Sequence, residues 1–428
     1  MKLINRHYEY LKPLYDKIFD LYDAVIISSG SEKVYTFDDQ NIPFRCNPYF
    51  SYFFPFISDS GHFLLLEKSG RKSLYLNKVD DFWHKHETYM PDTEISQYWN
   101  IDYFKDIDKL FKHFESSLKG KKTALVSNHN HANFNFNPPE LLNIIDESRF
   151  TKSEFEIDCI RYANKKAVKG HLAAKKAWKD GSSEFEINLR YCEAANSSGP
   201  ELPYENIIAL NENASFLHYH GKDHHAPKNR WSFLIDAGAT HLNYHSDISR
   251  TYGNGDIDFK NILFQLDKVQ LALCDSVKAG VDFADLHGLA HKKIAEVLNH
   301  TKLLDLNPSE IYKNKLTNYF FPHGLGHSIG LNVHDVWGKD PDRDTNKEYP
   351  FLRMNRVLRA GCVITIEPGI YFIKTLLDDL KKSSFRSNVN WKLVDKLKKS
   401  GGIRVEDDIV VKEDGHINLT REAFKNAE

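Results

Sequence analysis

The fold is decided by the stretch Phe233-Leu-Ile-Asp236-Ala-Gly-Ala-Thr-His-Leu-Asn-Tyr-His-Ser-Asp247-Ile-Ser-Arg250, where an apolar run ends in one carboxylate and a second follows eleven residues later. The pattern predicts a strand hairpin that reverses between Thr240 and Asn243. If residue 236 pairs opposite residue 247, both carboxylates lie on one face of two adjacent strands. Two anions held this close repel each other unless a cation lies between them, which indicates half of a metal site. Taken alone, the spacing is more typical of two solvated aspartates.

A second motif brings two histidines together in a glycine-rich stretch, Phe321-Pro-His323-Gly-Leu-Gly-His327-Ser-Ile-Gly330. Histidines four residues apart would stack on one face of a helix, but the interrupting glycines favour a loop whose backbone approaches a ligand closely. The two histidines can therefore have separate roles. By itself the motif also fits a purely structural loop.

Two further strands end in acids. In Cys362-Val-Ile-Thr-Ile-Glu-Pro-Gly369 the strand alternation puts Val363, Thr365 and Glu367 on one face. In the second strand, Gly402 to Val411, the same period puts Arg404 and Glu406 on one side, so a cation and an acid emerge together. Each strand alone could simply carry a charged outer face.

Together these motifs supply four carboxylates, Asp236, Asp247, Glu367 and Glu406, and one imidazole. This oxygen-rich ligand set suits two divalent ions of the manganese type, with zinc or cobalt also possible because a histidine is present. Two such ions, about 3.5 to 4 Å apart, share bridging carboxylates and hold a hydroxide that is a strong nucleophile near neutral pH. The sequence therefore predicts a hydrolase.

Composition narrows the partners. The chain has 428 residues, with 57 Lys and Arg against 59 Asp and Glu, so no electrostatic footprint for nucleic acid or an anionic membrane is present and a small-molecule partner is expected. The five cysteines are scattered, which favours a reducing compartment over a disulfide framework. The N-terminus lacks the apolar region of a signal peptide, and no uncharged stretch approaches the roughly 18 residues of a membrane span. We expect a cytoplasmic protein.

The length predicts two domains, which we place at residues 1–152 and 153–428. Helical spacing over 4–22 and 102–118 and strand patterns at 24–28, 61–66, 73–76 and 123–126 indicate a first domain with a mixed sheet. The stretch 128–139 is a loop, and its two histidines are expected to be solvated.

The second domain begins with helix signals. Thr151-Lys-Ser-Glu154 has the form of a capping box that opens a helix to about Asp180, and Ser183-Glu-Phe-Glu186 repeats the signal. A strand is expected over 202–210, followed by helices over 258–279 and 283–299. The predicted fold class is α/β (α+β).

The order of the motifs resembles that of the metallopeptidases with the pita-bread fold, which include methionine aminopeptidase, aminopeptidase P and prolidase. The chain is most similar to the bacterial prolidases, or Xaa-Pro dipeptidases, over essentially its whole length. The matching motifs are Pro43-Phe-Arg-Cys-Asn-Pro48, Asn211-Glu-Asn-Ala-Ser-Phe-Leu-His-Tyr219, Leu234-Ile-Asp-Ala-Gly238, Phe321-Pro-His-Gly-Leu-Gly-His327, Val333-His-Asp-Val336, Ile366-Glu-Pro-Gly-Ile-Tyr-Phe372 and Gly402-Ile-Arg-Val-Glu-Asp407. The resemblance implies an N-terminal mixed α/β domain followed by a pita-bread catalytic domain of the creatinase and aminopeptidase type.

The resemblance also assigns roles. It implies that the metal ligands are Asp236, Asp247, His327, Glu367 and Glu406, with Asp247 and Glu406 bridging two ions. It places His323 and His334 beside the reacting carbonyl, where they donate to the tetrahedral intermediate. Glu367 is similar to the family's proton shuttle.

For the substrate, the resemblance implies that His218 and Tyr219 line the proline side of the pocket. A dipeptide ends in a carboxylate just beyond proline, and the guanidinium of Arg404 could hold it with two parallel hydrogen bonds. The alternative for Arg404 is an ion pair with Asp407 or Asp408.

The stretch Phe37-Asp38-Asp39 resembles the loop by which one subunit of a family dimer reaches the site of the other, so a homodimer is expected, with either aspartate as the contributing residue. The implied function is the hydrolysis of Xaa-Pro dipeptides by hydroxide held between two metal ions, with a possible side activity on phosphotriesters. Two alternatives remain: an aminopeptidase P that acts on longer peptides, and a non-catalytic peptide-binding module.

Overall fold

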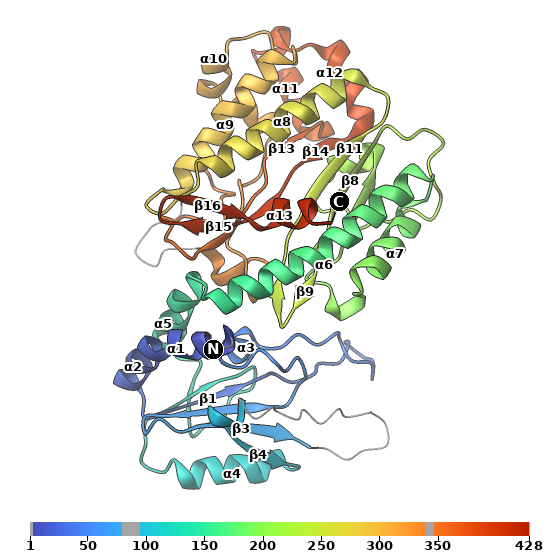
Figure 1. The fold of residues 1–428 in the computed structure, drawn as a ribbon. Coiled ribbons are helices and arrows are strands. Elements are labelled where there is room, and N and C mark those ends of the chain that lie inside the picture. The colour runs from blue at the N-terminus through green and yellow to red at the C-terminus, as the bar shows by residue number, and fades with distance from the viewer. Residues whose placement is uncertain (1–2, 79–94, 339–345, 428) are drawn as a thin grey trace. The chain divides into compact units, whose positions relative to one another are not determined.

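The structure, a computed structural model, describes residues 3–78, 95–338 and 346–427 (Figure 1). Two compact units are present, and each has its own core. The first comprises residues 1–149 with 153–155, and the second comprises residues 150–152 with 156–428. The functional motifs of the second unit are therefore positioned by that unit's own elements.

The first unit is built on a six-stranded mixed sheet with the order β4-β3-β2-β1-β5-β6. Its centre is β1, in which every residue of Ala-Val-Ile-Ile-Ser is buried, and which pairs antiparallel with β2 and parallel with β5. Phe114 packs into the cluster on one face of this sheet. The strands are β1 (Ala24–Ser28), β2 (Phe63–Glu67), β3 (Lys72–Asn77), β4 (Asn100–Phe104), β5 (Thr123–Val126) and β6 (Asn135–Phe136).

The helices of this unit differ in length from the predicted ones. The pattern over 4–22 divides into two helices near Leu11, where Pro13 in the first turn of the second helix favours a helix start. The pattern over 102–118 was too long, because its first residues form β4 and the side chain of Asp106 caps the helix that follows. The helices are α1 (Leu3–Tyr10), α2 (Lys12–Leu21), α3 (Pro48–Phe53), α4 (Ile107–Ser117) and α5 (Pro139–Phe150).

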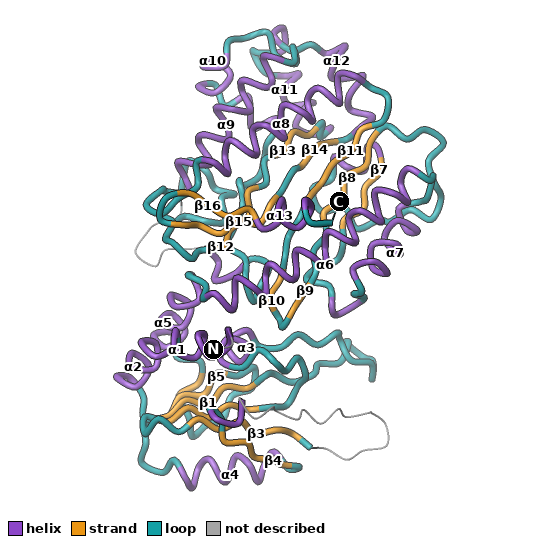
Figure 2. Tube along the Cα trace, in the orientation of Figure 1, coloured by secondary structure: helices purple, strands orange, loops and turns teal. Residues whose placement is uncertain are grey.

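The second unit combines small antiparallel sheets with long helices. Figure 2 shows β7, β8 and β11 side by side, and they form one sheet in the order β11-β8-β7. Trp178 and Ile187 pack against Phe233 and Ile235 of this sheet, so α6 and α7 bury one of its faces. The first elements of the unit are α6 (Glu154–Lys179), α7 (Glu184–Ala195), β7 (Ile207–Leu210), β8 (Ser232–Asp236), β9 (Thr240–His241), β10 (Tyr244–His245) and β11 (Ser249–Gly253).

The predicted hairpin forms, but its register differs from the prediction. Asp236 lies opposite Ser249, not opposite Asp247. The reason is that residues 240–245 form a separate two-stranded hairpin, β9 with β10, beyond the end of the main pair. Asp247 precedes Ser249 by two residues, which is the spacing of one face along a strand.

One capping signal is confirmed and one is wrong. Ser183 and Glu186 form the predicted capping box at the start of α7. Thr151 does not cap a helix, because α6 begins only at Glu154 and Thr151 forms a β-bridge with Cys362.

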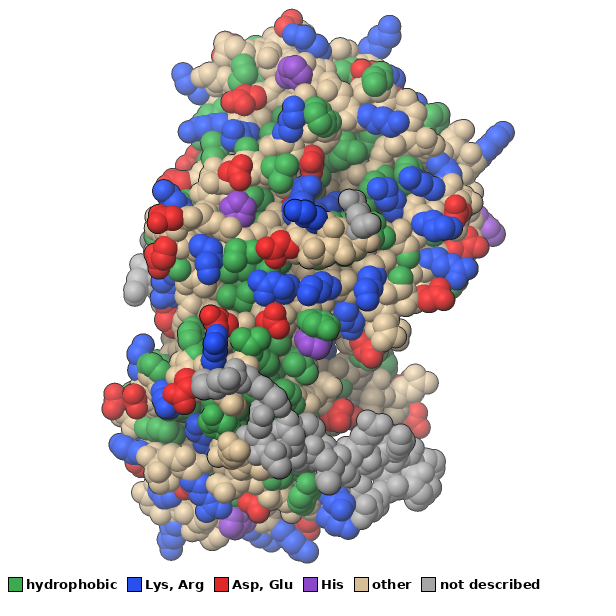
Figure 3. All heavy atoms as spheres, in the orientation of Figure 1, with side chains coloured by type: hydrophobic (Ala, Val, Ile, Leu, Met, Phe, Trp, Pro, Cys, Tyr) green, Lys and Arg blue, Asp and Glu red, His purple; other side chains and the backbone are tan. Residues whose placement is uncertain are grey.

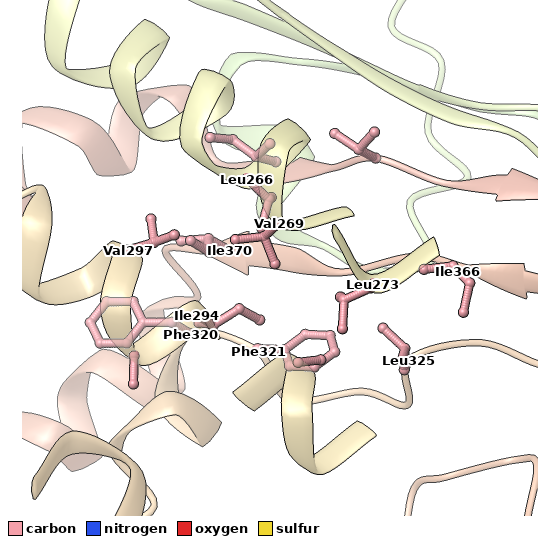
Figure 4. Packing of buried hydrophobic residues seen from close by; sticks show 14 of the residues in the cluster. Leu266, Val269, Leu273, Ile294, Val297, Phe320, Phe321, Leu325, Ile366 and Ile370 are labelled. Carbon is pink, nitrogen blue, oxygen red and sulfur yellow. The ribbon is translucent and has the colours of Figure 1, made fainter. Parts of the chain in front are cut away.

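The main core of the second unit lies around α8 (Ile257–Asp275) and α9 (Phe283–His300). Figure 4 shows Leu266, Val269 and Leu273 of α8 close to Ile294 of α9 and to Phe321. Gly280 lies between the two helices with φ of +84°, a conformation that favours glycine, and α8 and α9 agree with the predicted pair of helices. This core carries the loop that contains His323 and His327.

The last third of the chain supplies two more small sheets. One has the order β12-β15-β16 and the other pairs β13 with β14. Thr365 lies opposite Asp408 in the first, and Gly369 lies opposite Arg404 in the second. The elements are β12 (Val363–Ile366), β13 (Gly369–Tyr371), β14 (Gly402–Arg404), β15 (Asp407–Lys412) and β16 (Gly415–Asn418), with α10 (Pro308–Lys313), α11 (Lys374–Lys382), α12 (Trp391–Leu397) and α13 (Leu419–Lys425).

The five cysteines are free thiols: Cys159, Cys274 and Cys362 are buried, and Cys46 and Cys192 are half-buried. Acidic and basic side chains are interspersed over the face drawn in Figure 3. Within the described ranges, no helix has both the length and the hydropathy required to span a lipid bilayer.

Candidate metal centre

The predicted ligands come from the ends of four strands and one loop. Asp236 is the last residue of β8, Asp247 follows β10, His327 lies in the loop beside β12, Glu367 directly follows β12, and Glu406 separates β14 from β15. Although 170 residues separate the first from the last in sequence, these strand ends meet at one place. The structure therefore brings all five predicted side chains together.

The distances define a compact cluster. One ligand atom from each of Asp247, His327 and Glu406 lies within 4.8 Å of the others, and all three residues are buried. The Nε2 atom of His327 is 3.5 Å from Asp247 Oδ2 and 3.8 Å from Glu367 Oε1. Asp236 joins the cluster through Tyr204, whose hydroxyl lies 2.8 Å from Asp236 Oδ1 and 2.5 Å from Asp247 Oδ1.

His327 is held by the strand beside it. Its backbone N–H donates to Thr365 Oγ1 at 3.1 Å, and its carbonyl accepts from the N–H of Thr365 at 2.8 Å. This pairing brings the two chains so close that a Cβ on Gly326 would lie 2.0 Å from the carbonyl oxygen of Thr365. The glycine at position 326 thus permits a close approach to the neighbouring strand, whereas the sequence predicted a close approach to a ligand.

Glu406 is held by β11. Its N–H donates to the carbonyl of Ser249 at 3.1 Å, and the hydroxyl of Ser249 donates to Glu406 Oε2 at 2.7 Å. The N–H of Arg404 donates to Thr251 Oγ1 at 3.0 Å. The strand end that carries Glu406 is thereby fixed beside the strand that follows Asp247.

The two acids after Glu406 have other partners. Asp407 accepts hydrogen bonds from Arg250 at 2.6 Å and from Arg421 at 2.8 Å. Burial by itself would raise its pKa, but these two guanidinium groups lower it to about 2. Asp408 accepts from the backbone N–H of Asp247 at 3.2 Å and from Asn164 at 2.7 Å, so it orients one of the candidate ligands.

The buried acids of the cluster repel one another, which favours the binding of cations between them. Burial, reinforced by the neighbouring acids, raises the pKa of Asp236, raises that of Glu367 to about 7, and raises that of Glu406 well above its ordinary value. For Asp247 burial also acts to raise the pKa, but the hydrogen bond from His327 leaves it lowered. Acids that repel one another in a buried site fit a pair of divalent ions, and the oxygen-rich donor set agrees.

Arg404 is buried beside the cluster and engaged on all three nitrogens. Nη2 donates to Asp236 Oδ2 at 2.6 Å, Nε donates to Ser249 Oγ at 2.9 Å, and Nη1 donates to the hydroxyl of Tyr371 at 2.8 Å. Its ion pair is therefore with Asp236, not with Asp407 or Asp408. These bonds leave its guanidinium poorly placed to receive a substrate carboxylate.

His323 is also engaged on both ring nitrogens. Nδ1 lies 2.8 Å from the carbonyl of Gly324, so this nitrogen carries the hydrogen, and Nε2 accepts from the hydroxyl of Tyr371 at 3.0 Å. Burial, followed by the charge of Arg404, lowers the pKa of His323 to about 3. The imidazole is neutral and faces Glu367, whose Oε2 lies 3.7 Å from Nδ1.

His334 lies at the edge of the cluster, with its ring perpendicular to that of His327 and the ring centroids 4.4 Å apart. Burial, followed by the charge of His327, lowers its pKa to about 3, so it too is neutral. The guanidinium of Arg353 contacts the ring of His334. Arg353 is exposed, and its charge also lowers the pKa values of His218 and His323.

The structure separates the two residues predicted to line the proline side of the pocket. The side chain of His218 is exposed, and Arg353 and Arg404 both act on its pKa. The hydroxyl of Tyr219 donates to Glu184 Oε2 at 2.7 Å, and its ring packs against the cluster that contains Leu234.

Asp38 and Asp39 lie on an exposed loop of the first unit, where the side chain of Asp38 accepts from the N–H of Asp39 at 2.7 Å.

Sequence reasoning missed two residues, Tyr204 and Arg353. Tyr204 falls in the stretch predicted as strand over 202–210, but the strand begins only at Ile207, and the preceding turn aims the phenol at the cluster. Arg353 belongs to an irregular segment with no periodic or motif signal. Only the tertiary structure shows that either residue is near the metal centre.

Comparisons with known proteins identify the family of the chain. Residues 158–413 match the family model described as metallopeptidase family M24, and residues 2–146 match the model described as the N-terminal domain of Xaa-Pro dipeptidase.

Similar proteins include the Xaa-Pro dipeptidase of Pseudoalteromonas atlantica, which is 40% identical over 94% of each chain, and that of Shewanella baltica, which is 39% identical over 93% of this chain and 92% of the relative. Among solved structures, a low-pH form of aminopeptidase P from E. coli aligns with a TM-score of 0.76 and 21% identity over 99% of this chain and 96% of its own. An aminopeptidase of Pseudomonas aeruginosa aligns with a TM-score of 0.74 and 20% identity over 100% of this chain and 99% of its own. The chain belongs to metallopeptidase family M24 and has the pita-bread fold.

Proposed function

We propose that this protein is a metallo-dipeptidase that hydrolyses Xaa-Pro dipeptides at the bond before proline. The observation that carries the proposal is the convergence of four carboxylates and one imidazole: Asp247, His327 and Glu406 form a buried group, and Glu367 and Asp236 lie beside it. The relatives named Xaa-Pro dipeptidase, which match nearly the whole chain, support the choice of substrate.

We propose that Asp236, Asp247, His327, Glu367 and Glu406 would hold two divalent metal ions, and that Asp247 and Glu406 would be the carboxylates that serve both. Manganese is the native metal in this proposal because oxygen ligands dominate, and zinc and cobalt also fit the single imidazole. When bound, the ions supply Lewis-acid activation of the peptide carbonyl and of water.

The protein's own residues then move protons and orient the peptide. Hydrolysis breaks the bond between the carbonyl carbon and the prolyl nitrogen, and that nitrogen must take up a proton as it leaves. We propose that Glu367 delivers this proton, because its carboxyl group lies inside the cluster and faces the neutral ring of His323. His334, neutral and at the edge of the cluster, is the donor to the developing negative charge on the carbonyl oxygen.

For the terminal carboxylate of the dipeptide, we propose Arg353 in place of Arg404. Arg404 is buried and bonded to three protein groups, whereas Arg353 is exposed and contacts His334. A guanidinium at this place can bind a carboxylate through two parallel hydrogen bonds. His218, whose pKa responds to Arg353, is the residue that contacts the proline side.

A peptide panel tests the function. We expect the purified protein with added manganese, zinc or cobalt to hydrolyse glycyl-proline at least about tenfold more efficiently than Gly-Pro-Gly-Gly, because an interior proline offers Arg353 no carboxylate. A preference for the tetrapeptide would instead indicate an aminopeptidase P. Asp247→Ala should remove bound metal and activity together, while Glu413→Ala, an exposed acid on the same half of the chain, should change neither.

We also propose a cytoplasmic homodimer. The free cysteines favour a reducing compartment. The loop that carries Asp38 exposes Val34, Tyr35 and Phe37, and the side chain of Phe37 is fully exposed at φ of +62°. Such a cluster of exposed apolar groups is typical of an interface. Sedimentation of the wild type as a dimer and of Phe37→Ser as a weaker dimer would support this arrangement, whereas a monomeric wild type would exclude it.

A further inference from the structure

Residues 346–358, here called the Arg353 segment, run past the metal centre. The carbonyl oxygen of Phe351 and the Cα of Leu352 lie 3.0 and 3.3 Å from the place where a Cβ of Gly324 would be. The next residue along, Arg353, contacts the ring of His334. The position of the Arg353 guanidinium therefore depends on how the two ends of this segment are fixed.

The downstream end is fixed to the beginning of α9 by backbone pairing. Val357 forms a β-bridge with Asp282. The N–H of Phe283 donates to the carbonyl of Arg356 at 3.1 Å, and the N–H of Leu358 donates to the carbonyl of Val281 at 2.8 Å. These bonds are made by main-chain atoms, so they do not depend on particular side chains.

Among the described residues, the side chain of Tyr349 fixes the upstream end to the middle of α9. Its ring lies perpendicular to His287, with centroids 4.5 Å apart, and parallel to His291, with centroids 5.8 Å apart. Its hydroxyl is hydrogen-bonded to Tyr312, and burial together with this bond raises its pKa. Gly288 leaves room for it, because a Cβ there would lie 3.3 Å from the hydroxyl oxygen of Tyr349.

His287 and His291 are hydrogen-bonded to each other. Their Nε2 atoms are 3.2 Å apart, and Nδ1 of His291 lies 2.8 Å from Thr317 Oγ1. Nδ1 of His287 is buried and has no hydrogen-bond partner among the described residues. A lone pair is cheaper to leave unpaired there than an N–H, so His287 donates from Nε2 to His291. Burial is the main cause that lowers their pKa values to about 3 and 4, and both rings are uncharged near neutral pH.

The histidine pair is also connected to the metal centre through Phe321. The centroid of its ring is 5.7 Å from that of His287, 5.1 Å from that of His291 and 4.8 Å from that of His323. One face of α9 thus contacts the Arg353 segment and the loop of His323 together. The proposed hydrolysis of the peptide bond assigns no role to His287 and His291, which are uncharged and hydrogen-bonded to each other.

We propose that Tyr349, seated against His287 and His291, is a positioning residue that sets the affinity of the enzyme for the terminal carboxylate of its substrate. The inference rests on the proposed role of Arg353 as the carboxylate receptor. Tyr349 and the histidine pair touch no substrate. They fix the upstream end of the segment, so that Arg353 meets the carboxylate without first having to be ordered.

The test compares a dipeptide acid with its amide, because only the acid carries the charge that Arg353 reads. We expect Tyr349→Ala to raise KM for glycyl-proline about tenfold, to leave KM for glycyl-prolinamide within about twofold, and to change kcat for either substrate by less than about threefold. Tyr349→Phe, which keeps the ring and loses the hydroxyl, should fall between Tyr349→Ala and the wild type.

Two controls separate this inference from its foundation. Ile294→Val weakens the core one turn further along α9 and should lower stability while leaving the preference for acid over amide unchanged. If Arg353→Ala leaves that preference unchanged, the proposed carboxylate receptor is wrong. If Arg353→Ala abolishes the preference while Tyr349→Ala and His287→Phe both retain it, the receptor is right and the positioning role is overturned. Faster hydrogen exchange over residues 350–355 in Tyr349→Ala provides the structural readout, and unchanged exchange would also overturn the proposal.

Discussion

Tyr204 is an uncharged side chain that organises the candidate metal centre. Its hydroxyl is within hydrogen-bond distance of Asp236 and Asp247 at once. A phenol has a single hydrogen, so it shares that hydrogen between the two acids and fixes their separation. Groups that orient metal ligands in this way contribute to metal affinity without binding the metal.

Replacing the tyrosine tests this contribution. Tyr204→Phe should keep the ring in place and lower metal affinity or kcat about 10- to 100-fold. Titration of the metal-free protein with manganese, followed by activity, gives both numbers. Tyr162→Phe, an exposed tyrosine of the same unit, serves as the matched control, and wild-type metal affinity in Tyr204→Phe would argue against the assignment.

Glu367 makes the stability of the metal-free protein depend on pH. Its pKa is about 7 in the folded chain against an ordinary value of 4.5, so between these two values the folded state binds more protons than the unfolded state. The stabilising contribution is complete below pH 4.5 and is lost as the pH rises to about 7. The difference corresponds to about 3 kcal/mol.

Urea unfolding of the chelated protein at pH 5 and pH 7.5 measures this effect. We expect a lower free energy of unfolding at pH 7.5, and Glu367→Gln should reduce the difference because the amide does not titrate. A chelated wild type that becomes more stable as the pH rises would have the opposite sign to that expected for a carboxyl whose pKa is raised on folding.

At the level of elements, a buried ion pair holds the loop that carries His334. The ammonium of Lys152 lies 3.1 Å from Asp335 Oδ2, and both side chains are nearly inaccessible, at 1% and 2% exposure. Lys152 also lies 3.4 Å from the hydroxyl of Ser328, the residue after His327. Lys152, just before α6, therefore contacts both the loop that carries His334 and the loop that carries His327.

Removing the ammonium of Lys152 should be severe, because a buried carboxylate then loses the buried cation beside it. We expect Lys152→Met to cost about 3 to 5 kcal/mol of stability, as measured by chemical denaturation. The double variant Lys152→Met with Asp335→Leu should recover part of that loss. If Lys152→Met lowers the free energy of unfolding by no more than a surface substitution does, Lys152 and Asp335 do not form this ion pair in solution.

The elements also show what local sequence patterns can predict. Strand β1 and the capping box at Ser183 depend on neighbouring residues, and both were predicted correctly. The opposition of Asp236 to Asp247 was wrong, because the short β9–β10 hairpin takes up the residues between the two strands. The capping box at Thr151 failed for a similar reason, since a bridge to Cys362, far along the chain, competes with the cap.

At the level of the whole molecule, the two compact units predict separate responses to metal removal. The candidate ligands all belong to the unit formed by residues 150–152 and 156–428. Because a ligand stabilises the state that binds it, chelation should lower the unfolding temperature of that unit by several degrees and leave the first unit unchanged. Calorimetry with hydrogen exchange assigns each transition, and an equal shift in both units would contradict the prediction.

The site was only partly predictable from the sequence, and the reason is physical. Asp236, His327 and Glu367 follow apolar runs or lie among glycines, so their neighbours in sequence mark them. Tyr204 and Arg353 have no such neighbours, and contacts made by distant residues place them. The sequence also could not predict that Arg404 forms an ion pair with Asp236, because the two residues are 168 positions apart in the chain.

Two half-buried cysteines allow the opening of each compact unit to be followed by chemical labelling. Cys46 belongs to one unit and Cys192 to the other, and burial raises the pKa of both, to about 12 for Cys46. A raised pKa lowers the fraction of each half-buried thiol that is ionised, so both should react slowly with an alkylating reagent until their surroundings open. A timed pulse of such a reagent, read by peptide mass, would give the opening rate of each half of the wild-type chain without any introduced label.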